Sequence, residues 1–118
     1  MAVGLLAGLL ASSVLACETQ AGRSFRGGRL YVTGTEALDR GDATAAVRAL
    51  EEAAVLVPTA SEIRNHLGLA YQAAGERDRA RDAFEAAIDL DCDNTAARRN
   101  LARLDAGPGA SFEETRGE

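Results

Sequence analysis

Two stretches of the sequence decide the fold: RLYVTGTEALDRGDATAAVRALEEAAVLVP at residues 29–58 and IRNHLGLAYQAAGERDRARDAFEAAIDLDC at residues 63–92. Laid over each other so that Arg29 falls on Ile63, they correspond at eight positions. The pairs are Gly34 and Gly68, Ala37 and Tyr71, Gly41 and Gly75, Asp42 and Glu76, Ala46 and Ala80, Leu50 and Phe84, Ala53 and Ala87, and Pro58 and Cys92. Self-similarity at one fixed period is typical of helical repeat proteins.

The glycines of the repeat predict where its helices approach each other closely. Gly34 and Gly68 fall in the middle of expected helices, where Gly costs about 1 kcal/mol relative to Ala. Because the same cost recurs in both repeats, we expect both glycines to make room for a neighbouring helix. The residues expected to pack in and around these contacts are Ala46, Leu50 and Ala53 in the first repeat, and Leu67, Tyr71, Ala80, Phe84 and Ala87 in the second.

Turn and capping residues set the expected ends of the helices. Gly41 and Gly75 are placed to end the first helix of each pair, and Pro58 to stop the second. The segment 59–62 has the spacing of a capping box, and Asn94 is a candidate N-cap. The expected helices are 29–40, 43–57, 60–73, 77–90 and 95–105, the last an amphipathic cap, followed by a disordered tail at 106–118.

These motifs resemble the tetratricopeptide repeat, a unit of two antiparallel helices whose period matches the shift between the two stretches. The second unit carries the fuller pattern, and the first departs from it at Thr33 and Ala37, where the family usually has Leu and Tyr. The resemblance spans residues 27–105. It implies an all-α fold of two helix-pair repeats and a C-terminal capping helix, and thus a short α-solenoid domain at 29–105.

The N-terminal segment MAVGLLAGLLASSVLA at 1–16 carries no charge, is short for a membrane-spanning helix, and is followed by Cys17. Residues 14–17 (VLAC) resemble the lipobox of bacterial lipoproteins, which implies cleavage before Cys17 and lipidation of its thiol. We therefore expect a lipid-anchored, periplasm-facing protein of the bacterial cell envelope, with a linker at 17–28 and the outer membrane mildly favoured. A plain secretory signal cut after Ala16, giving a secreted or soluble periplasmic protein, and an uncleaved anchor stay open. Cys92, free or paired between chains, is expected to be a small apolar packing residue.

Composition excludes several classes of function. The net charge of −5 opposes nucleic-acid binding, which needs a basic surface. His66 is the only histidine, with no candidate nucleophile or base beside it in the sequence. The run Asp89-x-Asp91-x-Asp93 begins like a calcium loop, but Asn94 and Asn100 stand where that pattern needs Gly and Glu. We expect no catalytic residue, no metal and no cofactor.

The resemblance places a binding groove along the first helix of each repeat. The candidate groove residues are Tyr31, Thr35, Leu38, Asn65, Leu69, Gln72, Arg99 and Arg103. Guanidinium groups such as those of Arg99 and Arg103 suit acidic or carboxylate-bearing peptides. The alternative for this pair is an ordinary solvated face of a capping helix.

We therefore expect a non-catalytic scaffold that binds a protein or peptide partner and helps to assemble an envelope complex. Two alternatives remain: a self-associating structural protein, and an accessory subunit of an envelope enzyme. Two repeats and a cap bury little surface, so the sequence also predicts marginal stability of the isolated domain.

Overall fold

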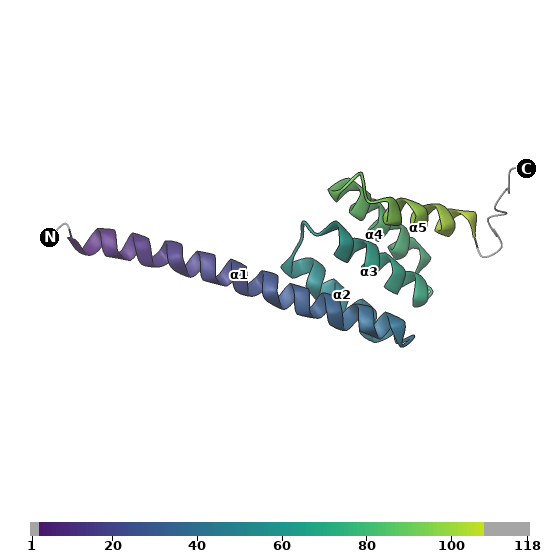
Figure 1. The fold of residues 1–118 in the computed structure, drawn as a ribbon, viewed down its shortest axis with the longest axis horizontal. Coiled ribbons are helices and arrows are strands. Elements are labelled where there is room, and N and C mark those ends of the chain that lie inside the picture. Colours follow the sequence, from purple (N-terminus) through teal and green to yellow (C-terminus); the bar gives the residue numbers. More distant parts are fainter. Residues whose placement is uncertain (1–2, 108–118) are drawn as a thin grey trace, which may run out of the picture.

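The computed structural model describes the backbone of residues 3–107 and the side chains of residues 19–107. These residues form five helices and no strand (Figure 1). The helices are α1 (Val3–Asp39), α2 (Ala43–Leu56), α3 (Ser61–Ala73), α4 (Arg77–Leu90) and α5 (Thr95–Ala106). The expected all-α architecture is confirmed, and the ends of α2 to α5 lie within one residue of the prediction.

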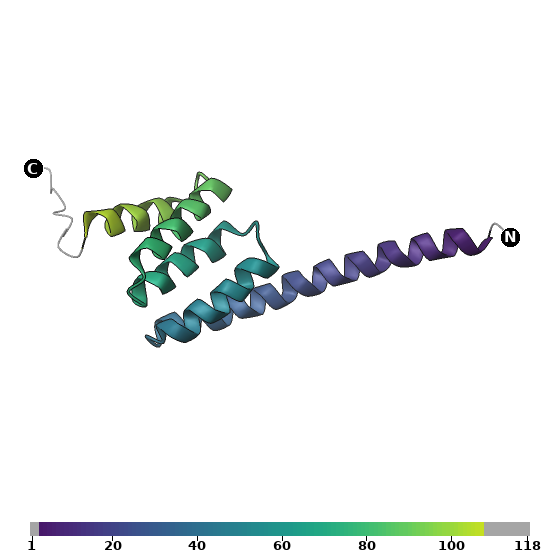
Figure 2. The same ribbon diagram turned by 180° about the vertical axis from the view of Figure 1, so that it is seen from behind.

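The helices pack as two consecutive hairpins and a single last helix. Helix α1 pairs with α2, α3 pairs with α4, and α2 contacts α3 so that the hairpins stack. Helix α5 packs on α4 and closes the stack, which makes a short α-solenoid. Figures 1 and 2 show that the stack lies beside the C-terminal half of α1, whose N-terminal half projects away from it.

The turns inside the two hairpins are built alike. Gly41 and Gly75 have φ of 77° and 79°, a left-handed conformation that favours glycine. Backbone amides at the same repeat positions close both turns: Asp42 N–H donates to the Ala37 carbonyl at 2.9 Å, and Glu76 N–H donates to the Tyr71 carbonyl at 2.8 Å. Each hairpin therefore reverses the chain by the same local geometry.

The core forms where the two helices of each hairpin approach. A Cβ atom built on Gly68 would lie 2.5 Å from Cε1 of Phe84, and one built on Gly34 would lie 2.5 Å from Cγ of Leu50. Leu50 and Phe84 are fully buried. The remaining buried core side chains are mostly alanines, which allow the short distance between helices: Ala37, Ala46, Ala49, Ala53, Ala54, Ala70, Ala80, Ala83, Ala87 and Ala97.

The largest difference from the sequence prediction lies before residue 29. The expected linker at 17–28 is helical, since α1 runs unbroken through it. Two contacts with α2 and the turn after it explain part of this extension. A Cβ atom on Gly27 would lie 2.5 Å from Cγ2 of Val57, and Arg26 forms an exposed ion pair with Glu52. The folded unit therefore begins before the predicted boundary.

One capping prediction is wrong and another is confirmed. The N-cap of α3 is Ala60, which has no side-chain cap, so the capping box expected at residues 59–62 does not form. Asn94 does cap α5, because its side-chain oxygen accepts a hydrogen bond from the Ala97 amide at 3.0 Å. The side chain of Cys17 and the predicted tail from residue 108 onward lie outside the described residues.

Candidate functional site

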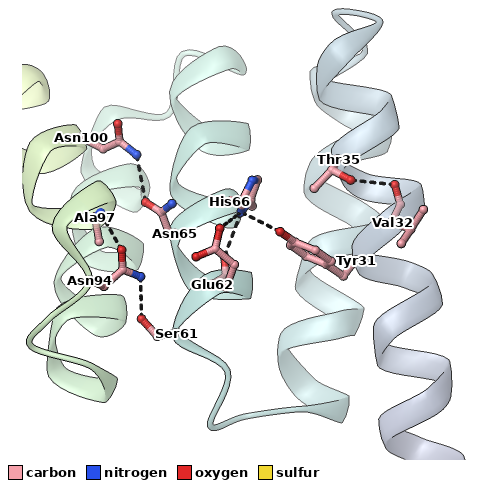
Figure 3. Close-up of polar contacts among 10 residues, drawn as sticks. All are labelled: Tyr31, Val32, Thr35, Ser61, Glu62, Asn65, His66, Asn94, Ala97 and Asn100. Carbon is pink, nitrogen blue, oxygen red and sulfur yellow. Dashed lines mark hydrogen bonds and ion pairs between the residues drawn. The ribbon is translucent and has the colours of Figure 1, made fainter.

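The eight candidate groove residues occupy repeating positions on three helices. Tyr31, Asn65 and Arg99 stand one repeat period apart on α1, α3 and α5, and Thr35, Leu69 and Arg103 follow one helical turn later. Figure 3 shows Tyr31 of α1 directed toward His66 of α3, and Asn65 of α3 and Asn100 of α5 directed toward each other. Positions that recur in the sequence therefore lie at equivalent places on α1, α3 and α5.

Tyr31 and His66 make the contact between α1 and α3 (Figure 3). The Tyr31 hydroxyl lies 3.4 Å from His66 Nδ1, and the two rings stand edge to face with centroids 5.1 Å apart. His66 Nδ1 also lies 3.0 Å from the Glu62 carbonyl and 3.2 Å from its carboxylate. Burial and then the charge of Glu62 raise the pKa of Tyr31. Tyr31 is thus partly enclosed by the helix beside it.

Asn65 and Asn100 make the equivalent contact between α3 and α5. The Asn100 side-chain amide donates to Asn65 Oδ1 at 2.9 Å. This pair and the Tyr31–His66 pair both join residues 35 apart in the sequence, so equivalent repeat positions meet twice along the stack. Asn65 is only 2% exposed. Its side chain therefore links two helices and leaves little surface for a ligand.

A third polar contact ties the N-terminal ends of α3 and α5. The Asn94 amide donates to Ser61 Oγ at 2.8 Å, and Ser61 Oγ donates to the Ala87 carbonyl at 2.8 Å. Sequence reasoning missed Ser61, Asn100 and the partner role of His66. The pairs Tyr31–His66 and Asn65–Asn100 have the same spacing of 35 residues, which is the sequence signal that could have found them. A spacing alone does not show which side chains are in contact.

The other candidate residues differ in how open they are. Thr35 donates its hydroxyl to the Val32 carbonyl at 2.9 Å, within α1. Leu38 and Leu69 are partly buried against the core. Gln72, Arg99 and Arg103 are exposed. The polar groups most open to a partner thus lie on α5 and at the end of α3.

Gln72 and Arg103 come together in a pocket of about 250 Å³ at the C-terminal ends of α3 and α5. Its other lining residues are Gly75, Arg77, Leu104 and Gly107. The Arg77 guanidinium is already used, because it donates to the Leu104 carbonyl. Arg99 and Arg103, in contrast, pair with no carboxylate among the described residues.

The opposite side of the stack carries a separate polar cluster around Tyr71. Its hydroxyl donates to Glu51 Oε1 at 2.5 Å, and the Arg79 guanidinium lies 5.8 Å from its ring centroid. Burial, followed by the hydrogen bond to Glu51, raises the pKa of Tyr71 to about 12. This cluster holds α2, α3 and α4 together.

The acidic run after α4 forms a turn. Asp91 Oδ1 accepts a hydrogen bond from the Asp93 amide at 3.0 Å. Within residues 19–107, no three ligating side chains gather into a cluster that could hold a metal ion. Cys92, expected to be a packing residue, is instead exposed and free, because it follows the end of α4. In the described part of the chain, no helix has both the length and the apolarity that crossing a membrane requires.

The comparison with known proteins identifies one part of this architecture. No curated protein matches the chain. A family model does match residues 61–94, which include α3, α4 and the turns that follow them. Repeats of that family are typically non-catalytic protein-interaction modules. Residues 61–94 of this chain are a tetratricopeptide repeat.

Proposed function

We propose that this chain is a non-catalytic scaffold that binds an acidic segment of a partner protein along α1, α3 and α5. The tetratricopeptide repeat at residues 61–94 supports a protein-interaction role in general. The exposed pair Arg99 and Arg103 carries the finer proposal. These side chains stand one turn apart, and each can bind a carboxylate through two parallel hydrogen bonds.

The position of Arg99 explains why this end of the groove is open. Tyr31 and Asn65 are its equivalents in the two repeats. Tyr31 on α1 contacts His66 on α3, and Asn65 on α3 contacts Asn100 on α5. Among the described residues no helix follows α5, so Arg99 has no such neighbour. A partner segment bound beside α5 would lie next to Arg99 as α3 lies next to Tyr31 and α5 lies next to Asn65.

Photo-crosslinking in the native cell tests this proposal. A photoreactive residue at Thr35 or Gln72 should give an adduct of one mass, and that adduct should fall at least fivefold in an Arg99→Ala/Arg103→Ala background. Arg48 and Glu85 are matched control positions, since both are exposed on the second helices of the hairpins. Equal adducts from groove and control positions would contradict a groove-specific partner.

The membrane part of the proposal is that lipidated Cys17 tethers the scaffold to a bacterial envelope membrane, facing the periplasm, where it helps to assemble an envelope complex. The sequence 14–17 (VLAC) supports this tether. One acyl chain gives only marginal membrane binding, whereas two or more anchor stably. The intact mass of the native protein from membranes should equal residues 17–118 plus acyl chains. Cys17→Ser should abolish the added mass, and an unmodified mass from wild type would overturn lipidation.

A self-associating structural protein remains the second candidate, and one observation favours it. Phe25 and Val32 are 71% and 51% exposed on α1 and line the same surface hollow, and adjoining exposed apolar side chains are typical of an interaction surface. Light scattering of the chain from residue 18 onward at micromolar concentration distinguishes the two candidates. A monomer favours the scaffold, whereas oligomers that dissociate in Phe25→Ser favour self-association.

A further inference from the structure

A cleft of about 490 Å³ lies where α1 leaves the stack, between α1 and the turn that joins α2 to α3. Figures 1 and 2 show the C-terminal end of α2 beside α1 at this point. One wall of the cleft comes from α1 between residues 19 and 24, and the other comes from residues 56–59. The cleft therefore lies in the corner between a projecting helix and one end of the stack.

The lining of the cleft carries one positive charge and no negative charge. The charge is that of Arg23, which forms no ion pair with any residue from 19 to 107. Glu52, which lies four residues before the lining begins on α2, is already paired with Arg26. The hydroxyl groups of Ser24 and Thr59 belong to the same lining. Because a guanidinium and hydroxyl groups are good donors to phosphate oxygens, the cleft suits a phosphate-bearing anion.

The stack side of the cleft adds an apolar wall, made by Leu56, Val57 and Pro58. Val57 is held in place against α1, since a Cβ atom built on Gly27 would lie 2.5 Å from its Cγ2. An apolar wall beside phosphate-binding groups favours a phosphate ester with an apolar part over inorganic phosphate, because the wall can cover that part from water.

The position of the cleft along α1 points to a membrane lipid as the source of the phosphate, and this step rests on the proposed tether at Cys17. Arg23 lies about 9 Å from residue 17 along the helix axis. Helical side chains tilt toward the N-terminus, so the guanidinium reaches back toward the anchored end. The headgroup layer of a bilayer is about 5–7 Å thick on each side. A chain anchored at residue 17 therefore holds the cleft at the level of the lipid phosphates.

The charges of α1 fit this position. From residue 19 to residue 35, α1 carries Arg23, Arg26 and Arg29 and no acidic residue, although the whole chain has a net charge of −5. The part of the described chain nearest the proposed anchor is therefore basic, and it favours a negatively charged membrane surface.

We infer that the cleft binds the phosphodiester of an anionic membrane phospholipid. The guanidinium of Arg23 binds the phosphate oxygens, and the hydroxyl groups of Ser24 and Thr59 donate to them. The glycerol part of the lipid lies against Val57 and Pro58. This contact holds the stack against the membrane surface, where a tether alone would leave it free to swing.

Titration with a soluble short-chain lipid tests the binding without any tether. The ¹⁵N-labelled chain from residue 17 onward, which includes every contact described above, is titrated with dihexanoylphosphatidylglycerol below its critical micelle concentration. The amide signals of Ser24, Val57 and Thr59 should shift together and saturate, and Arg23→Ala should weaken binding at least tenfold. Arg29→Ala is the matched control, because Arg29 is an exposed arginine of the same helix outside the cleft, and it should leave binding unchanged.

Three results would overturn the inference. The first is the absence of a saturable shift up to the critical micelle concentration. The second is an equal loss of binding in Arg23→Ala and Arg29→Ala, which would mean attraction by charge in general. The third is equally tight binding of inorganic phosphate, which would mean a site for free anions. Circular dichroism of both variants should show unchanged helicity, because both arginines are exposed.

A second measurement supplies the tether chemically. The chain from residue 17 onward with Cys92→Ser, a change at an exposed free thiol, is coupled through Cys17 to a maleimide lipid in nanodiscs that contain phosphatidylglycerol. A spin label on the lipid headgroups should broaden the amide signals of Val57 and Thr59 at least threefold more in this protein than after Arg23→Ala. Equal broadening would mean that Arg23 does not hold the stack at the membrane.

The tether and the cleft can fail separately. If the native protein carries acyl chains but the short-chain lipid does not bind, the tether stands and the lipid site is wrong. If the lipid binds as expected and the native mass is unmodified, the lipid site stands without the proposed anchor.

Discussion

At the scale of single residues, Gly68 and Phe84 show how this protein builds a core with few large side chains. Gly68 lies close against the fully buried Phe84 ring, and Gly34 lies as close to the buried Leu50 side chain in the first hairpin. Each such glycine carries an intrinsic cost of about 1 kcal/mol in a helix. Close packing of one large side chain per hairpin is what offsets that cost.

Gly68→Ala should therefore destabilise the protein although it improves helix propensity. The added Cβ would sit 2.5 Å from Cε1 and 2.6 Å from Cδ1 of a ring that cannot move into solvent. Overpacking of this kind costs about 1–3 kcal/mol, against a propensity gain of about 1 kcal/mol. Urea unfolding should show the loss. The control is Gly28→Ala, where nothing lies within 4 Å and stability should not fall.

Ionisation of Tyr71 should lower the stability of the folded protein at alkaline pH. Its pKa is raised from 10.0 to about 12 in the folded protein, mainly by burial and then by the hydrogen bond to Glu51. The neutral phenol is thus favoured by folding, so its contribution is complete below pH 10 and is lost as pH rises toward 12. Wild type should lose more free energy of unfolding than Tyr71→Phe between about pH 9 and pH 11.5. Parallel pH curves for the two proteins would contradict this origin.

At the scale of helices, equivalent positions carry different residues according to what lies next to them. Ile63, Leu67 and Ala70 of α3 are buried. Their equivalents in the first repeat, on α1, are Arg29, Thr33 and Glu36, all exposed. No described helix stacks against that side of α1, so polar residues end the stack there. At the other end, α5 joins the core through Leu104 and pairs Asp105 with Arg81.

Asn94→Ala should lower the free energy of unfolding by more than the loss of an N-cap alone would. Asn94 accepts from the Ala97 amide and also donates to Ser61, so two hydrogen bonds are lost. The expected cost is about 1.5–3 kcal/mol. Asp42→Ala is the matched control, since Asp42 caps α2 through the Ala45 amide alone, and it should cost about 1 kcal/mol. Equal losses in chemical denaturation would mean that the bond to Ser61 adds nothing.

At the scale of the whole molecule, the stack is short and the N-terminal half of α1 projects away from it (Figures 1 and 2). Two hairpins and one helix share two small clusters of buried apolar residues. Only Leu50 and Phe84 among the larger side chains of the described residues are fully buried. Repeat arrays gain stability from each added interface, and this one has few.

The isolated domain should therefore be marginally stable. Thermal unfolding of residues 18–118, followed by circular dichroism, should give a midpoint below about 70 °C. The midpoint of a monomer should stay constant over a hundredfold range of protein concentration, whereas self-association through α1 should raise it with concentration. A concentration-independent midpoint above about 70 °C would contradict the small core.

The repeat period in the sequence determined the class of fold, the five helices and the turns at Gly41 and Gly75, because these depend on local backbone preferences and on the spacing of small residues. The resemblance to the tetratricopeptide repeat implied the eight candidate groove residues, which lie on α1, α3 and α5. Only the tertiary structure decided which of them are open. Asn65 is enclosed because Asn100 comes to lie against it from another helix, whereas Arg99 and Arg103 are exposed because no described helix follows α5. The length of α1 also needed the structure, since its contacts with Glu52 and Val57 join residues far apart in the chain. The local sequence pattern determines the helices and turns. Burial depends on contacts with residues far away in the sequence, which a local pattern does not specify.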